Sequence, residues 1–203
     1  SRLFGRSHGD IVLLGVTLVG LVLLFQLTPG FTVTDWIYVL QHVLVLGVAL
    51  TRRAPERQDR SLLSNASIVV VYAYPYGQLI YLRWVPGDAP WPEGGVYIVA
   101  AGACLSLATL LSLGRRFGVR PALRGLATKG PYRLIRHPMY LAYMIADFGY
   151  NLQEWNWGTA LMVLVGWVAL VYRIYAEERI LANDPGWAAY AARVKSRLIP
   201  WLW

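Results

Sequence analysis

The sequence contains few of the residues from which metal sites and disulfides are built. Cys104 is its only cysteine and it has only three histidines, which excludes an internal disulfide and leaves no spacing typical of a metal site. We interpret Cys104 as a small packing residue within an apolar segment. The chain also lacks a G-x-S-x-G element, a P-loop and a G-x-G-x-x-G fingerprint. A nucleotide-like ligand, if one binds, is therefore held without the usual soluble folds.

Charged residues are scarce as well. They make up only 15% of the chain, against 57% hydrophobic residues, and a run of about 18 or more apolar residues is typical of a transmembrane helix. Spans or near-spans are predicted at residues 11–27, 36–50, 62–82, 95–113, 138–153 and 157–175. The first run also resembles a secretory signal peptide, but no A-x-A-like cleavage site follows it. We predict an all-α polytopic membrane protein with about six transmembrane helices.

The basic residues cluster on one side of the predicted membrane. The net charge is +8, and of the 19 Lys and Arg residues only Arg83 falls near the opposite side. Because cytoplasmic loops retain Lys and Arg, this asymmetry predicts cytoplasmic N- and C-termini in a bacterial inner membrane or an ER-type membrane. The outer boundary carries an interfacial belt of Trp36, Trp84, Trp91, Trp155 and Trp157. We expect the basic loop 115–124 to contact anionic lipid and expect no nucleic-acid partner.

The composition changes near residue 113. Residues 1–113 consist of spans joined by short turns, whereas residues 114–203 contain a basic loop, a helical hairpin and a polar tail. We interpret 1–113 as a transmembrane scaffold and 114–203 as a catalytic subdomain, both within one integrated membrane domain. Pro138 suits the first position of a helix. After a break at 183–186, we expect Asp184 to cap a cytosolic amphipathic helix that begins at Pro185.

Polar side chains gather around the helix start predicted at Pro138. Arg136, His137 and Tyr140 flank it. A helix N-terminus presents free N–H groups and a positive dipole end, and arginine is a bidentate carboxylate binder. These residues predict a corner at the cytoplasmic face that binds a carboxylate or a phosphate. The alternative is that Arg136 reaches toward lipid headgroups while His137 only caps the helix.

A second polar group follows in the last predicted span. Arg173 and Glu177 are four residues apart and can pair along a helix, which leaves Glu178 as the freer acid. Such a carboxylate can accept the hydroxyls of a ribose or neutralise a cation; alternatively, the two glutamates form a solvated helix end. Because the hairpin returns 136–140 and 173–178 to the same side, we expect them to enclose one small molecule.

Polar residues also occur inside the predicted spans. Asp147 follows Tyr143 by one helical turn, and an acid within a membrane span is a functional candidate by default. Asp147 either faces a wet cavity or is hydrogen-bonded to a neighbouring helix. Gln41 and His42 either line a tunnel for a substrate or tie helices together by hydrogen bonds.

In their order, the residues of the second half resemble the C-terminal signature of the isoprenylcysteine carboxyl methyltransferases, which membrane phospholipid N-methyltransferases share. The resemblance covers about residues 115–203. It rests on Gly130-Pro131-Tyr132, Arg136-His137-Pro138-Met139-Tyr140, Glu177-Glu178, Leu181, Gly186, Tyr190, Val194, Arg197 and Pro200. The first 113 residues resemble these enzymes only in being spans.

The resemblance implies S-adenosylmethionine as cofactor, in a pocket formed by the last two spans and the C-terminal tail. The implied cofactor-binding residues are Tyr132, His137, Pro138, Tyr140 and Glu177. The residues that correspond to the functional arginine and glutamate of the family, and that we expect to be catalytic, are Arg136 and Glu178. We expect the substrate to be contacted by Tyr143, Asp147 and Arg173.

The function implied by the resemblance is methyl transfer to a lipophilic acceptor drawn from the bilayer, such as an isoprenylcysteine carboxylate or a lipid head group, without a metal. Positioning and exclusion of water supply much of such catalysis. A carboxylate acceptor needs no base, whereas an amine or a phenol must lose a proton, so an anionic or readily deprotonated acceptor is favoured. Phenolic lipids and small thiols stay open.

Two other functions remain open at this point. Membrane sterol and steroid reductases carry a similar Arg-His-Pro-x-Tyr element and use a nicotinamide cofactor, although Met139 stands where they usually have asparagine. A six-span transporter or lipid-binding scaffold would place its polar groups at the middle of the membrane, whereas this sequence concentrates them at the inner face.

Overall fold

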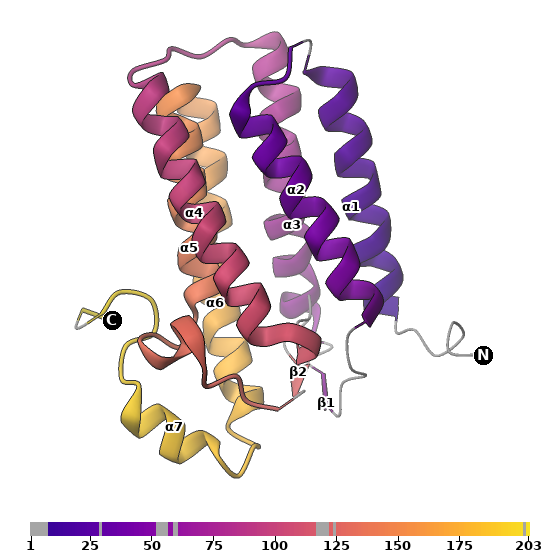
Figure 1. Cartoon of the computed structure of the whole chain (residues 1–203). Coiled ribbons are helices and arrows are strands. Elements are labelled where there is room, and N and C mark those ends of the chain that lie inside the picture. The colour runs from indigo at the N-terminus through magenta and orange to yellow at the C-terminus, as the bar shows by residue number, and fades with distance from the viewer. Residues whose placement is uncertain are drawn as a thin grey trace.

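The computed structural model describes residues 8–28, 30–51, 57–58, 61–116, 122–123, 125–200 and 202–203. Within these residues, long helices run up and down side by side, and a short helix lies beneath one end of the bundle (Figure 1). The long helices are α1 (His8–Leu27), α2 (Val33–Thr51), α3 (Leu62–Trp84), α4 (Pro92–Leu113), α5 (Pro138–Gln153) and α6 (Trp157–Leu181). The short helix α7 (Trp187–Arg193) marks what we call the α7 end of the bundle.

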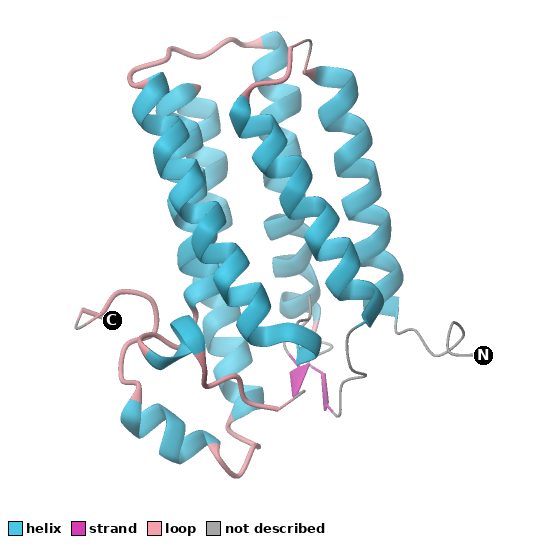
Figure 2. Ribbon diagram, viewed as in Figure 1, coloured by secondary structure: helices cyan, strands magenta, loops and turns pink. Residues whose placement is uncertain are grey.

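The connections are short irregular segments (Figure 2). They include two 3₁₀ turns, η1 (Gly114–Arg116) and η2 (Gly130–Arg133). Two-residue strands β1 (Arg57–Gln58) and β2 (Ala122–Leu123) pair antiparallel near the α7 end. The predicted all-helical fold is therefore confirmed, apart from this minimal β-pair. Among the described residues, α4 and α6 are the helices that are long and apolar enough to cross a membrane, judged by length and composition alone.

Local sequence signals set the helix boundaries. The Ser61 hydroxyl accepts a hydrogen bond from the N–H of Ser64 at the start of α3. Asn156 and Thr159 form a reciprocal capping box at the start of α6. Pro138 occupies the first turn of α5, as its fixed φ predicts. The last two signals fix where the chain enters α5 and α6, the two helices that carry the polar cluster described below.

The core depends on a close approach between α4 and α5. A Cβ atom on Gly102 would lie 2.8 Å from the Ala142 carbonyl oxygen, and one on Gly149 would lie 2.7 Å from the Val99 nitrogen. Small residues at such points let helix backbones touch, which is how helices pack where the hydrophobic effect gives no drive. The pair is therefore a rigid support for the N-terminus of α5.

The outer faces of the long helices are apolar. Large side chains exposed there include Leu18 and Phe25 of α1, Trp36 of α2, Val69 of α3, Leu111 of α4, Phe148 of α5 and Leu161 and Val168 of α6. Cys104 is also exposed, so its prediction as a packing residue is wrong. Its place on the outward side of α4 explains why a small apolar residue suffices there.

The C-terminal segment differs from its prediction at α7. The helix begins at Trp187 with Gly186 at the N-cap position, not at Pro185. The Asp184 carboxylate accepts from the N–H of Gly186 at 2.8 Å and so holds a turn before the helix. Beyond α7 the chain returns to α5, where the N–H groups of Arg136 and His137 donate to the carbonyls of Ser196 and Arg197 at 3.0 and 2.9 Å. These two bonds pin the tail to the start of α5.

Candidate active site

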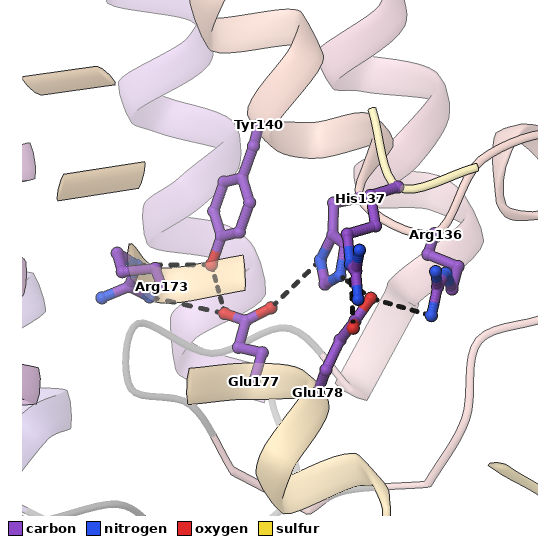
Figure 3. Close-up of polar contacts among 7 residues, drawn as sticks. Arg136, His137, Tyr140, Arg173, Glu177 and Glu178 are labelled. Atoms are coloured by element: carbon purple, nitrogen blue, oxygen red, sulfur yellow. Dashed lines mark hydrogen bonds and ion pairs between the residues drawn. The ribbon is translucent and has the colours of Figure 1, made fainter. Parts of the chain in front are cut away.

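Two segments that are far apart in the sequence form one polar cluster at the α7 end. Arg136 and His137 come from the start of α5, and Glu177 and Glu178 come from the end of α6 (Figure 3). An Arg136 guanidinium nitrogen lies 3.0 Å from a Glu178 carboxylate oxygen. The tail pinned to α5 covers this cluster, so that its groups are largely shielded from solvent.

Glu177 is the centre of the first half of the cluster. The Tyr140 hydroxyl donates to its carboxylate, and Arg173 lies 3.5 Å from the same oxygen, which confirms the pairing predicted from their spacing. Arg173 also donates through Nε to the Tyr140 oxygen at 3.3 Å. The second Glu177 oxygen lies 3.7 Å from His137 Nδ1. This network fixes the Tyr140 ring and places a buried arginine beside it.

Glu178, which the sequence predicted to be the freer of the two acids, is paired as fully as Glu177. Its carboxylate lies 3.0 Å from Arg136, 3.3 Å from His137 Nε2 and 3.0 Å from Nε of Arg197. Arg197 belongs to the tail, whose conformation no local sequence pattern sets. The reading of the two glutamates as a solvated helix end is likewise wrong, since the Glu178 side chain is only 12% exposed.

The alternatives for Arg136 and His137 also fail. The Arg136 side chain is 11% exposed and paired with Glu178, so it does not extend toward lipid headgroups. His137 stands at the N-cap of α5 without a side-chain capping hydrogen bond. Both side chains turn toward the glutamates instead (Figure 3), because a buried cation needs a nearby anion.

The two carboxylates control the protonation of His137. Burial would lower the pKa of His137, but hydrogen bonds to Glu177 and Glu178, together with their negative charges, outweigh burial and raise the pKa of His137 above its ordinary value of 6.5. A protonated His137 adds to the charges of Arg136, Arg173 and Arg197. The cluster then holds more positive than negative charge, which suits a bound anionic group.

A cavity opens beside this cluster, between η2, α5, α6 and α7. Its wall includes Tyr132, Arg136, His137, Tyr140, Glu177 and Trp187. Nε of Arg136 and Nε of Arg116, which also lines the cavity, are buried and have no hydrogen-bond partner in the described part of the chain. A buried N–H without a partner is costly, so two such groups beside one cavity fit a ligand with carboxylate or phosphate oxygens.

The predicted site residues take different positions around this cavity. Tyr132 is buried and lines it, and its carbonyl accepts from the Tyr190 hydroxyl at 2.9 Å. Glu178 and Pro138 are absent from the described cavity wall, so Glu178 reaches the cavity through Arg136 and His137. Asp147 lies farther along α5 and lines a different cavity, described below.

Arg116 and Trp187 are cavity residues that the sequence did not single out. Arg116 was placed in a basic loop expected to contact lipid. It turns inward because α4 ends at Gly114, whose φ of 49° redirects the chain. A Cβ on Gly125 (φ 85°) would lie 3.5 Å from Arg116 Nε. Trp187 lies 5.8 Å from the Arg136 guanidinium, a cation–π contact. The two glycines were the only local signal for Arg116.

Comparison with known proteins adds one finding. Residues 93–184 match the model of the PEMT family, described as phospholipid methyltransferase. The match begins in α4, includes α5 and α6, and contains every predicted site residue from Tyr132 to Glu178. No curated protein sequence matches the chain. The predicted resemblance to the membrane methyltransferase superfamily is confirmed for residues 115–184. The match also includes most of α4, which was predicted to resemble the family only as a span, and it ends before the tail.

Proposed function

We propose that this protein is an integral-membrane methyltransferase that uses S-adenosylmethionine, because residues 93–184 match the phospholipid methyltransferase family model. The acceptor is a lipophilic molecule that presents an isoprenylcysteine-like carboxylate or a lipid head group at the cytoplasmic face. The observation that carries this proposal is the cavity beside the matched segment, which combines two arginine Nε atoms that have no hydrogen-bond partner among the described residues, a glutamate and aromatic rings.

The residues of this cavity fit the proposed cofactor. The unpartnered N–H groups of Arg116 and Arg136 suit its carboxylate. The ring faces of Tyr140 and Tyr143, with the Glu177 carboxylate nearby, suit its sulfonium cation. When bound, the cofactor supplies a methyl group that the sulfonium charge has already activated. The protein therefore needs no metal for this step and no covalent intermediate.

The residues of the chain then act by position and by exclusion of water. Arg173 and Glu177 fix Tyr140 from two sides, which holds the aromatic wall where donor and acceptor would meet. Glu178 orients Arg136 and His137 and links them to Arg197 of the tail. The tail and α7 shield the cavity, which suppresses the reaction of the methyl group with water.

The bundle supports the proposed membrane location. All six long helices expose large apolar side chains outward, whereas ion pairs gather at the α7 end. An apolar belt with ionic groups at its edge is the pattern expected when water replaces lipid at that level. We therefore assign six membrane spans, with the α7 end and both termini on the cytoplasmic side.

Ligand binding tests the proposal directly. Titration of the purified protein with S-adenosylhomocysteine and, separately, with NADPH is expected to raise the unfolding temperature only with the former. Arg136→Ala and Glu178→Ala should weaken this binding and reduce labelled methyl transfer from S-adenosylmethionine into a lipid and peptide extract. Arg133→Ala is the matched control, because Arg133 is exposed and lies outside the cavity.

Each other result has a clear meaning. Stabilisation by NADPH alone would indicate a reductase, and no response to either ligand would indicate a transport or lipid-binding scaffold. Unchanged binding and turnover in both Arg136→Ala and Glu178→Ala would remove the site assignment.

A further inference from the structure

A second cavity lies inside the bundle and adjoins the first. It is lined by residues of α1, α2, α3, α4 and α5 and has a volume of about 190 Å³, against about 120 Å³ for the cavity at the α7 end. Val71, Tyr72 and Tyr143 line both cavities. These three residues are therefore the place where a molecule in one cavity can approach a molecule in the other.

Several of the polar groups in the second cavity are paired with neighbouring helices. His42 Nδ1 lies 2.7 Å from the Tyr38 carbonyl and must donate to it, since a carbonyl only accepts, while Nε2 lies 2.7 Å from the Tyr76 hydroxyl. The Gln78 amide lies 3.5 Å from the Thr159 carbonyl. As the sequence allowed, His42 thus ties α2 to α3, and it also lines the cavity.

In the Asp147 carboxylate, only one of the two oxygens is hydrogen-bonded to a described residue. Oδ2 accepts from the Tyr74 hydroxyl at 2.5 Å and from Trp167 Nε1 at 2.9 Å. Oδ1 receives no hydrogen bond from any residue that the structure describes. A carboxylate oxygen on a cavity wall that receives no hydrogen bond from the protein can accept one from a ligand in that cavity.

A break in the main-chain hydrogen bonding of α3 lies where the cavities meet. Pro75 is inside α3 and has no N–H, so it cannot donate to the carbonyl four residues earlier, which belongs to Val71. Both Pro75 and Val71 line the second cavity. The α3 backbone therefore lacks one main-chain hydrogen bond at the level of the Asp147 carboxylate. A ligand that donates a hydrogen bond to Oδ1 of Asp147 fits this cavity wall.

We propose that this intramembrane cavity is the acceptor site, and that the reacting group of the acceptor is a hydrogen-bond donor (N–H, O–H or S–H) whose proton passes to Asp147. This inference rests on the proposed methyltransferase function and narrows its substrate. As the bond between the acceptor atom and the methyl carbon forms, the S–C bond breaks and its electron pair goes to sulfur. The acceptor proton goes to Oδ1 of Asp147, so charge and atoms balance.

The same geometry selects against anionic acceptors. A carboxylate in this cavity would lie near the carboxylate of Asp147, and a second carboxylate, Asp35, lines the same cavity. Like charges repel strongly where the surroundings are apolar. The cavity therefore favours amines, phenols or thiols with an apolar body over the carboxylate acceptor that the sequence favoured. Its walls in α1, α2 and α3 lie outside the segment that matches the family. The preference for one acceptor over another would therefore depend largely on residues 1–113.

Binding measured without cofactor tests the cavity itself. The full-length protein in lipid nanodiscs is titrated with three probe pairs: an alkylphenol and its methyl ether, an alkanethiol and its methyl thioether, and an alkylamine and its trimethylammonium analogue. In at least one pair, the X–H compound should bind about 10-fold or more tightly than its methylated partner, because only the X–H compound can donate a hydrogen bond to the carboxylate and such a bond contributes an affinity of about this size. Asp147→Asn should abolish this difference, whereas Asp88→Asn, at an exposed position, should preserve it.

A cavity-filling variant checks the location. Val45→Phe fills the second cavity, which Val45 lines, and should weaken binding of the X–H probe without changing the affinity for S-adenosylhomocysteine. Val69→Phe makes the same change on the outward face of α3, where Val69 is 65% exposed, and should change neither.

The outcomes separate this inference from the methyltransferase proposal. Equal binding within all three pairs, discrimination that survives Asp147→Asn, or preferred binding of an alkanoate would overturn the acceptor site even if S-adenosylhomocysteine binds. Failure to bind S-adenosylhomocysteine would overturn the methyltransferase, while the probe pairs would still decide what the intramembrane cavity holds.

Discussion

Removing the charge of Glu178 tests the polar cluster most severely. In Glu178→Gln the side chain keeps its shape, but Arg136, His137 and Arg197 lose the carboxylate that lies 3.0–3.3 Å from each. Breaking a buried ion pair costs about 3–5 kcal/mol because it leaves an uncompensated charge. Arg197 is 28% exposed and is partly screened by water. We therefore expect the free energy of unfolding to fall by about 2–4 kcal/mol.

Thermal unfolding of the purified protein measures this loss. For a chain of this size, 1 kcal/mol corresponds to a shift of about 2–4 °C, so the midpoint should fall by about 5–15 °C. The affinity for S-adenosylhomocysteine should fall as well, because Arg136 and His137 would no longer be held at the cavity wall. Glu93→Gln, an exposed change in the first turn of α4, is the control and should shift the midpoint by no more than about 1 °C.

A particular result would refute the reasoning. If Glu178→Gln unfolds at the same temperature as the wild type and binds S-adenosylhomocysteine equally well, the three cations do not depend on this carboxylate. The cluster would then be a set of independent contacts. If binding falls while stability is unchanged, Glu178 would touch the ligand itself, contrary to its position outside the described cavity wall.

Three further predictions concern other parts of the structure. The pKa of His137 is raised in the folded protein, so protonation of His137 stabilises the fold. This stabilisation is fully present below about pH 6.5 and is lost as the pH rises through the pKa of the folded state. The thermal unfolding midpoint should therefore fall over that pH range in the wild type and vary less in His137→Gln. Gly102→Ala should cost about 1–3 kcal/mol in thermal unfolding, since its Cβ would meet α5 backbone atoms at 2.8 Å, whereas Gly15→Ala, with nothing within 4 Å, should not destabilise. Tyr190→Phe removes the donor to the buried Tyr132 carbonyl and should cost about 1 kcal/mol in unfolding and weaken binding of S-adenosylhomocysteine; unchanged values would show that Tyr190 acts only by packing.

The sequence predicted the helices well because their signals are local. Apolar runs located all six long helices, and Pro138 predicted the start of α5 correctly. The last helix was expected to continue beyond the span at 157–175 as a polar helix until a break at 183–186, and α6 does continue to Leu181. That extension is stabilised by ion pairs across to α5, which a pattern within one segment cannot show.

The composition of the polar cluster was predictable only in part. Spacing gave the Arg173–Glu177 pair, and the expected hairpin brought Arg136 near the glutamates. The third partner of Glu178, Arg197, arrives through the folded tail, and Arg116 arrives through a turn at Gly114. Both depend on contacts between distant parts of the chain. A single sequence carries no direct signal for such contacts.

The intramembrane cavity was beyond sequence reasoning for a related reason. Asp147 was identified as an acid inside a span, but whether it was paired or free depended on Tyr74 and Trp167, which lie on other helices. The structure shows that both expectations hold in part, because one oxygen is paired and Oδ1 receives no hydrogen bond from the described residues. A cavity is what several helices leave unfilled, so it appears only once their packing is known.

The two adjoining cavities suggest how one small bundle would combine a polar donor with an apolar acceptor. Guanidinium groups that are stable near the α7 end would be costly deeper in the membrane, and an apolar acceptor gains nothing from an ionic cavity. Separating the two environments and joining them at Val71, Tyr72 and Tyr143 satisfies both requirements. Tyr143 also stands one helical turn from Asp147 on α5, so the proposed proton acceptor lies close to the only wall that the two cavities share among the described residues. A substitution that tilts α5 would thus move Tyr143 and the Asp147 carboxylate together. Binding of the acceptor and removal of its proton should then be lost together.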